Sequence, residues 1–85
     1  MIKKGDLIMK NINKKNVGLG SIGDATYHTL KNKRDDILTI IFTKGKLELE
    51  VKNIERVNVY NESMNIIFKD NKEQFINLLQ VTYIE

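Results

Sequence analysis

The chain has 85 residues, with 14 Lys and Arg side chains against 11 Asp and Glu, and a formal net charge of +3. This length predicts one small domain over residues 1–85. Because the sequence has no cysteine, a disulfide-stapled secreted scaffold is excluded. Since no apolar run reaches membrane-spanning length, we expect a cytoplasmic protein that does not enter a membrane.

Composition and charge are unevenly distributed. Lys, Asn and Ile are abundant and Pro and Trp are absent, which is typical of an AT-rich coding sequence and favours a bacterial or phage source. Residues 1–36 carry eight basic and four acidic side chains, whereas residues 37–85 carry six basic and seven acidic ones. The basic character therefore lies in the first part of the chain, where it indicates an anionic partner.

The first 23 residues predict little regular structure. Residues 1–8 are interpreted as a non-native or loosely packed extension, because Met9 is an alternative start to Met1. Residues 7–12 carry enough apolar side chains for a first strand. Residues 13–23 contain three glycines and two lysines and predict a polar loop.

The segment 25–30 has two interpretations. Its β-branched and aromatic side chains favour a second strand. The alternative is a short helix capped by Asp24, since Asp is a good N-cap residue. We take the strand as the prediction, followed by a charged turn over residues 31–36.

The rest of the chain predicts strands. Residues 37–43 carry apolar groups on both faces, as a covered central strand does. Residues 47–51 alternate apolar and charged side chains, which is typical of a half-buried strand. Further strands are expected around residues 57–59, 64–68, 75–76 and 81–84. A helix over residues 73–80 is the weaker alternative for that segment.

A degenerate repeat supports these strands. Residues 40–46 reappear as 66–72 at an offset of 26, and residues 53–60 reappear as 77–84 at an offset of 24. Side chains alternate faces along a strand, so an even change of spacing keeps later residues on the same face. Lys44-Gly45 and Asp70-Asn71 occupy the turn of each copy, and Gly and Asn accept positive φ there. The repeat therefore predicts a duplicated hairpin–bend–strand unit over 40–60 and 66–84.

The predicted fold class is all-β and mainly antiparallel. We expect a small β-barrel or sandwich of about seven or eight short strands, built on the duplicated unit, with at most one short helix.

The glycines of the loop fit the pattern G-x-G-x-x-G at Gly18, Gly20 and Gly23. A dinucleotide site requires a strand before this pattern and a helix after it, and the sequence predicts neither. The remaining hypothesis is an anion-binding loop, in which the backbone N–H groups of these three glycines hold a phosphate.

Basic and aromatic side chains in the first part of the chain form the candidate binding surface. A β scaffold that binds nucleic acid combines cations with aromatic rings on which bases stack. The candidates are Lys10, Lys14, Lys15, Tyr27, Lys31, Lys33 and Arg34.

No group of residues predicts catalysis or metal binding. His28 is the only histidine, whereas a zinc site needs three or four ligands. Glu48 and Glu50 share one face of a predicted strand, which is typical of a solvated face. We therefore expect a protein that is not an enzyme and has no cofactor or metal.

The leading hypothesis is a small non-catalytic binding protein that acts through a protein–protein interface and forms a homodimer, since small β proteins cover exposed strand edges by association. Its composition favours a phage or mobile-element factor that inhibits or adapts a host protein. The alternative is a nucleic-acid-binding β module that uses the basic segment 10–34. A third hypothesis is a pocket for a phosphate or nucleotide at the glycine loop.

Overall fold

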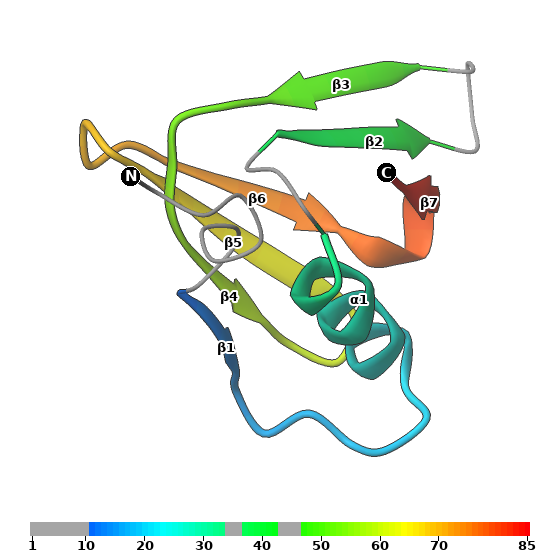
Figure 1. Ribbon diagram of the computed structural model, residues 1–85. Helices are drawn as coiled ribbons and strands as arrows, with labels where there is room; N and C mark the ends of the chain where they lie inside the picture. The colour runs from blue at the N-terminus through cyan, green and yellow to red at the C-terminus, as the bar shows by residue number, and fades with distance from the viewer. Residues whose placement is uncertain (1–10, 34–36, 43–46) are drawn as a thin grey trace.

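The computed structural model describes residues 11–33, 37–42 and 47–85, and these form seven strands, one α-helix and one 3-10 turn (Figure 1). In chain order they are β1 (Ile12–Lys14), α1 (Ile22–Lys31), β2 (Leu38–Phe42), β3 (Glu48–Val51), β4 (Ile54–Val59), β5 (Ser63–Phe68), β6 (Glu73–Asn77), η3 (Leu78–Gln80) and β7 (Val81–Ile84). The expected extension over residues 1–8, Lys10, Arg34 and the turn at 44–45 lie outside the described residues.

The strands form two sheets, and neither closes into a barrel within the described part of the chain. One sheet has the order β1-β4-β5-β6 and the other the order β3-β2-β7. All pairings are antiparallel except that of β1 with β4, which is parallel. The prediction of a mostly β domain with one short helix is confirmed, with the sheets stacked as Figure 1 shows.

The apolar face of each sheet points to a shared core. Along β5, Met64 and Ile66 are fully buried, as are Val57 and Val59 along β4. The core as a whole consists of Ile12, Leu30, Leu38, Ile40, Val51, Ile54, Val57, Val59, Met64, Ile66, Ile76 and Leu78. These core residues come from α1, η3 and every strand except β7. Burial of their side chains therefore holds the two sheets and α1 together.

The prediction of a strand over residues 25–30 is wrong, because this segment is the middle of α1. Ser21 is the N-cap: its backbone is extended and its Oγ accepts a hydrogen bond from the N–H of Asp24 at 3.1 Å. Helical spacing then turns Thr26 and Leu30, four residues apart, toward the interior. The alternative helix was correct in kind, but its cap is Ser21 and not Asp24.

The strand predictions after residue 37 are confirmed, and the helix considered for 73–80 is absent. That segment is β6 followed by η3, in which Asn77 Oδ1 accepts a hydrogen bond from the N–H of Leu79. The hairpin between β5 and β6 turns at Asp70-Asn71 as expected, and Asn71 has a φ of 71°. The loop is longer than the two residues predicted, since the N–H of Phe68 donates to the carbonyl of Lys72.

The two sheets contain similar pairings. Each contains a hairpin, β2–β3 or β5–β6, whose first strand also pairs with the last strand of the other predicted copy, β7 or β4. Ile40 pairs with Ile84, and Ile66 pairs with Val57, each followed by a one-residue register shift. If the two pairings are equivalent, Ile84 corresponds to Val57. The 24-residue offset of the sequence repeat instead aligns Val57 with Val81, so the two correspondences disagree. The duplicated unit stays a prediction.

The first turn of α1 packs directly on the turn between β4 and β5. The N–H of Gly23 donates to the carbonyl of Asn61 at 2.8 Å, and a Cβ at Gly23 would overlap the carbonyl oxygen of Tyr60. Gly18 in the preceding loop is different, because a Cβ added there would have Asn61 Oδ1 as its nearest neighbour, at 3.9 Å.

We therefore expect Gly23→Ala to destabilise the fold by about 1–3 kcal/mol, because the helix must move away from Tyr60. Gly18→Ala is the matched control and should change stability by less than about 0.5 kcal/mol. Urea unfolding followed by circular dichroism measures both. Equal midpoints for the two variants would contradict the close packing of α1.

Candidate anion-binding surface on β1 and α1

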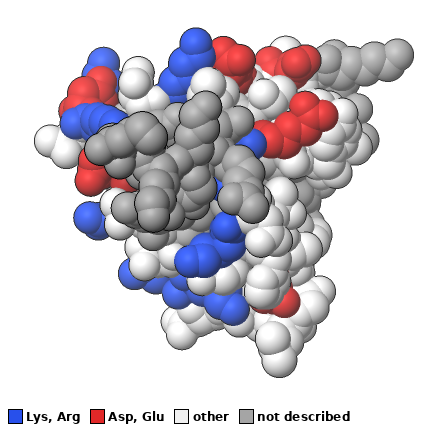
Figure 2. Space-filling view, viewed as in Figure 1, with Lys and Arg blue, Asp and Glu red and all other residues white. Residues whose placement is uncertain are grey.

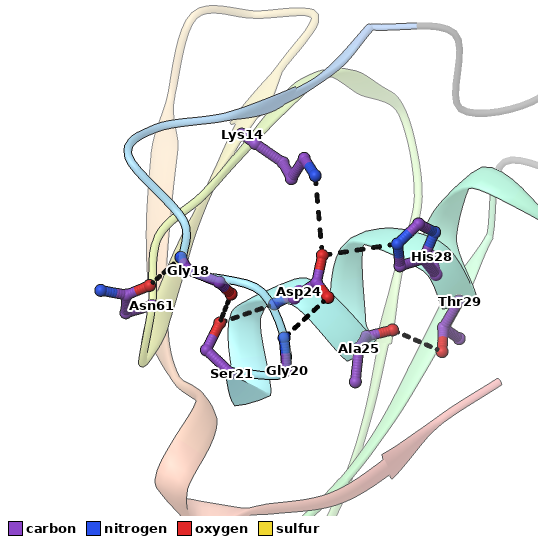
Figure 3. Close-up of polar contacts among 9 residues, drawn as sticks. All are labelled: Lys14, Gly18, Gly20, Ser21, Asp24, Ala25, His28, Thr29 and Asn61. Atoms are coloured by element: carbon purple, nitrogen blue, oxygen red, sulfur yellow. Dashed lines mark hydrogen bonds and ion pairs between the residues drawn. The ribbon is translucent and has the colours of Figure 1, made fainter.

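Two lysines lie where β1 ends beside the helix. Lys14 is the last residue of β1, and the N–H of Lys15 donates to the carbonyl of Val59 at 2.9 Å, which extends the parallel pairing with β4 by one residue. Since α1 packs against β1 and β4, the Lys14 side chain is directed along the helix surface, as Figure 3 shows.

Asp24 is at the centre of the polar contacts in Figure 3. Its Oδ2 accepts a hydrogen bond from the N–H of Gly20 at 3.0 Å. Its Oδ1 lies 3.6 Å from Lys14 Nζ and 3.4 Å from His28 Nε2, the latter one helical turn further on. Because Asp24 is only 9% exposed, its carboxylate joins the loop, the helix and β1 at one nearly buried point.

These contacts lower the pKa of the Asp24 carboxyl below its ordinary value of 3.8. The hydrogen bond from Gly20 is the largest cause, burial opposes it, and the charges of His28 and Lys14 add to the lowering. Asp24 is therefore an anion at neutral pH, and it offsets part of the charge of Lys14.

Tyr27 lies between two of the predicted cations. Lys14 Nζ lies 4.7 Å from the centroid of the Tyr27 ring, and Lys31 Nζ lies 6.0 Å from it. Both distances are within cation–π range. His28 contacts the same ring edge-on at a centroid distance of 5.5 Å. The structure thus brings together Lys14, Tyr27 and Lys31, which the sequence had only named as candidates.

Lys15 and Lys33 extend this group at its two ends. Lys15 is exposed after β1, and Lys33 follows the last turn of α1, where its N–H donates to the carbonyl of Leu30. We call Lys14, Lys15, Lys31 and Lys33 the basic surface. In Figure 2 most of the blue side chains of the lower half of the molecule have no red neighbour among the described residues, whereas red and blue alternate in the upper half.

The predicted anion loop is already occupied by acceptors from the protein itself. The N–H of Gly18 donates to Asn61 Oδ1 at 2.8 Å, that of Gly20 to Asp24, and that of Gly23 to the Asn61 carbonyl. Ser21 adds a bond from its N–H to the Gly18 carbonyl. A phosphate would have to displace these acceptors, so the geometry supports a structural role for the three glycines.

The premise of the sequence argument against a dinucleotide site is wrong. A strand, β1, does precede the G-x-G-x-x-G pattern, and a helix, α1, does follow it. The backbone N–H groups that would bind a pyrophosphate nevertheless donate to Asn61 and Asp24 instead. The carboxylate of Asp24 also places a negative charge beside this loop.

The other candidate groups do not assemble into a reactive site. Ser21 Oγ donates to the Gly18 carbonyl at 2.8 Å, so its hydroxyl is not directed to His28. Glu50 lies 3.5 Å from Lys52 on an exposed strand. Among the residues that the structure describes, no three His, Cys, Asp or Glu side chains are grouped to hold a metal ion.

Sequence reasoning missed Asp24 and Asn61 as organisers of this surface, and two hollows elsewhere. The spacing Ser21-x-x-Asp24 is a helix-start pattern that would have located α1, and with it the contact between Asp24 and His28. One hollow, of about 280 Å³, lies between α1 and β7, and another, of about 570 Å³, lies at the β5–β6 hairpin.

No family model, curated protein or solved structure matches this chain. Within the described ranges, α1 is too short and too polar to cross a membrane, and no other helix qualifies.

The lowered pKa of Asp24 predicts a pH-dependent stability. Since the folded protein holds this carboxyl deprotonated more strongly than the unfolded chain does, its contribution is complete above about pH 4 and is lost as pH falls through the lowered pKa. Asp24→Asn should therefore unfold at lower urea than the unaltered protein at pH 7, and the two should converge near pH 2.

Urea midpoints measured between pH 2 and pH 7 give this comparison. Glu62→Gln, which removes one exposed carboxylate from the turn before β5, controls for the change in net charge and should follow the unaltered protein. A constant difference between Asp24→Asn and the unaltered protein across this range would show that the Asp24 charge does not act.

Proposed function

We propose that this chain is a non-catalytic binding protein whose basic surface binds the phosphate backbone of a nucleic acid. One observation carries the proposal: Lys14 and Lys31 meet at the ring of Tyr27, while the only acid of this segment, Asp24, is nearly buried and turned toward Lys14 and His28. Cations of one sign gathered on one surface attract a polyanion and release its counterions.

The geometry favours contacts to phosphates over contacts to bases. The Tyr27 ring is only partly exposed, and Lys14 lies over it at 4.7 Å, so this ring is not an open platform for a stacked base. Lysines at the end of a strand and along one helix instead suit the spaced charges of a backbone. Binding of this kind depends little on sequence and strongly on salt.

The test measures affinity for a labelled 20-base-pair duplex as a function of salt. The four lysines of the basic surface predict a slope of log K against log salt of roughly −3 to −4. Lys15→Gln with Lys31→Gln should weaken binding and reduce the magnitude of this slope by about 2, one unit for each lost phosphate contact.

Lys52→Gln with Arg56→Gln is the matched control, because it removes the same charge from exposed side chains outside the basic surface and should leave the slope unchanged. Absence of binding to duplex and to single strands at low salt would overturn the proposal.

A second candidate function is a protein–protein interface that forms a homodimer. The groove of about 280 Å³ lies between α1 and β7 and has no charged residue among those that line it, which are Ile22, Ala25, Thr26, Thr29, Leu78, Val81, Thr82, Tyr83 and Ile84. β7 is the last strand of its sheet in the described structure, so a strand of a second copy could pair with its other edge. An uncharged edge suits self-association of a chain with net charge +3, since like charges do not meet there.

A homodimer predicts a dimeric mass in light scattering. Ile22→Glu should give a monomeric mass, because Ile22 is 44% exposed in the groove and the substitution places a charge there. Leu19→Glu is the matched control: Leu19 is 92% exposed, is outside this groove, and should leave the dimer intact. A monomeric mass for the unaltered protein at high concentration would exclude the second copy as partner.

The duplicated unit is also retained as a proposal. It is supported by the corresponding orders β4-β5-β6 in one sheet and β7-β2-β3 in the other, and by the matching pairings of Ile40 with Ile84 and of Ile66 with Val57. The hypothesis of a phage or mobile-element factor acting on a host protein remains a prediction from composition.

A further inference from the structure

The larger hollow of the described structure lies at the opposite end of β4 and β5 from α1. It has a volume of about 570 Å³ and is lined by the bend that joins β3 to β4 and by the β5–β6 hairpin, two segments that lie at the left of Figure 1. Its lining consists of Lys52, Asn53, Phe68, Lys69, Asp70, Lys72, Glu73 and Gln74. This volume is within the range of small-molecule sites.

Backbone hydrogen bonds hold the two walls of this pocket together. The N–H of Lys69 donates to the carbonyl of Asn53 at 2.9 Å, which ties the hairpin to the bend. Asn53 and Asn71 have φ values of 59° and 71°, so each wall turns sharply at an asparagine. The pocket is therefore formed before any ligand arrives.

The acids of the pocket are engaged by the protein, and two of its cations are not. Asp70 Oδ1 accepts the N–H of Lys72 at 3.1 Å, and Glu73 Oε1 accepts Asn65 Nδ2 at 2.8 Å. Lys69 and Lys72 are exposed and form no ion pair with the described residues. Among the described residues, no carboxylate therefore pairs with these two ammonium groups of the pocket lining.

The inner side of the pocket has a different chemistry. Phe68 is partly buried and packs against the core, and Gln74, which pairs with Ile66 on the adjacent strand, lines the same pocket. A phenyl ring offers a flat apolar surface, and an amide offers one donor group and one acceptor. A ligand that fits both parts has an anionic group and a flat polar ring.

We propose that this pocket binds a mononucleotide. Lys69 and Lys72 hold the phosphate, the base lies against Phe68, and the amides of Gln74 and Asn53 bond to the edge of the base. The site is separate from the basic surface and from the glycine loop, where the sequence had suggested a phosphate. It needs neither the homodimer nor nucleic-acid binding.

The test is a titration of isotope-labelled protein with AMP, GMP, adenosine and pyrophosphate, followed by amide chemical shifts. We expect AMP or GMP to shift the amides of residues 68–74 and of Asn53, and to bind at least tenfold more tightly than adenosine or pyrophosphate. Lys69→Gln with Lys72→Gln should reduce nucleotide affinity at least tenfold, whereas Arg56→Gln, which removes an exposed cation outside this pocket, should not change it.

The outcomes separate the parts of the proposal. Shifts confined to Lys14, Tyr27 and Lys31, or none at millimolar nucleotide, would overturn it. Pyrophosphate that binds as tightly as AMP would also overturn it, because the base would then add nothing. Gln74 is partly exposed, and Gln74→Ala leaves the net charge unchanged. This variant should weaken the binding of AMP but not that of pyrophosphate.

Discussion

The contact of Gly23 with the turn between β4 and β5 determines where the helix lies, and the basic surface follows from it. The N–H of Gly23 is bonded to the Asn61 carbonyl and the Tyr60 carbonyl fills the place of a side chain. Asn61 also accepts the N–H of Gly18, so the loop and the helix are attached to the same turn. From this point α1 runs past the end of β1 and carries Tyr27 to Lys14. Backbone packing therefore brings Lys14 and Lys31 to the same ring.

The same strands connect the two ends of the molecule. β4 and β5 begin or end at the turn that supports α1, and at their other ends are the bend and hairpin that enclose the 570 Å³ hollow. The core between them is continuous, with Val57, Val59, Met64 and Ile66 fully buried. At the first end Leu30 of α1 completes the core, whereas at the second the core ends at Phe68. The pocket lies where no helix of the described residues covers the end of the sheets.

The strands were predicted from the sequence, whereas the helix was only the alternative to a predicted strand, for a physical reason. Alternation along residues 47–51 and turn-forming residues such as Asn71 act locally, so they are visible in the sequence. Thr26, Tyr27 and Thr29 favour strands by intrinsic preference, but the cap at Ser21 and burial of Leu30 outweigh it. The candidate cations could be named for the same reason, whereas the pairing of Asp24 with His28 exists only once the segment is helical.

The abundance of lysine has a compositional explanation, but the arrangement of the lysines does not. An AT-rich coding sequence raises the number of lysines everywhere, and those of the upper half in Figure 2 lie among acidic side chains. Between residues 11 and 33 the only acid is Asp24. Its carboxylate is nearly buried, contacts Lys14 and His28, and has a lowered pKa. Composition supplies the charges, and the fold directs the one acid between residues 11 and 33 to Lys14 and His28. The placement of Asp24, more than the number of lysines, is therefore the argument for an anionic partner.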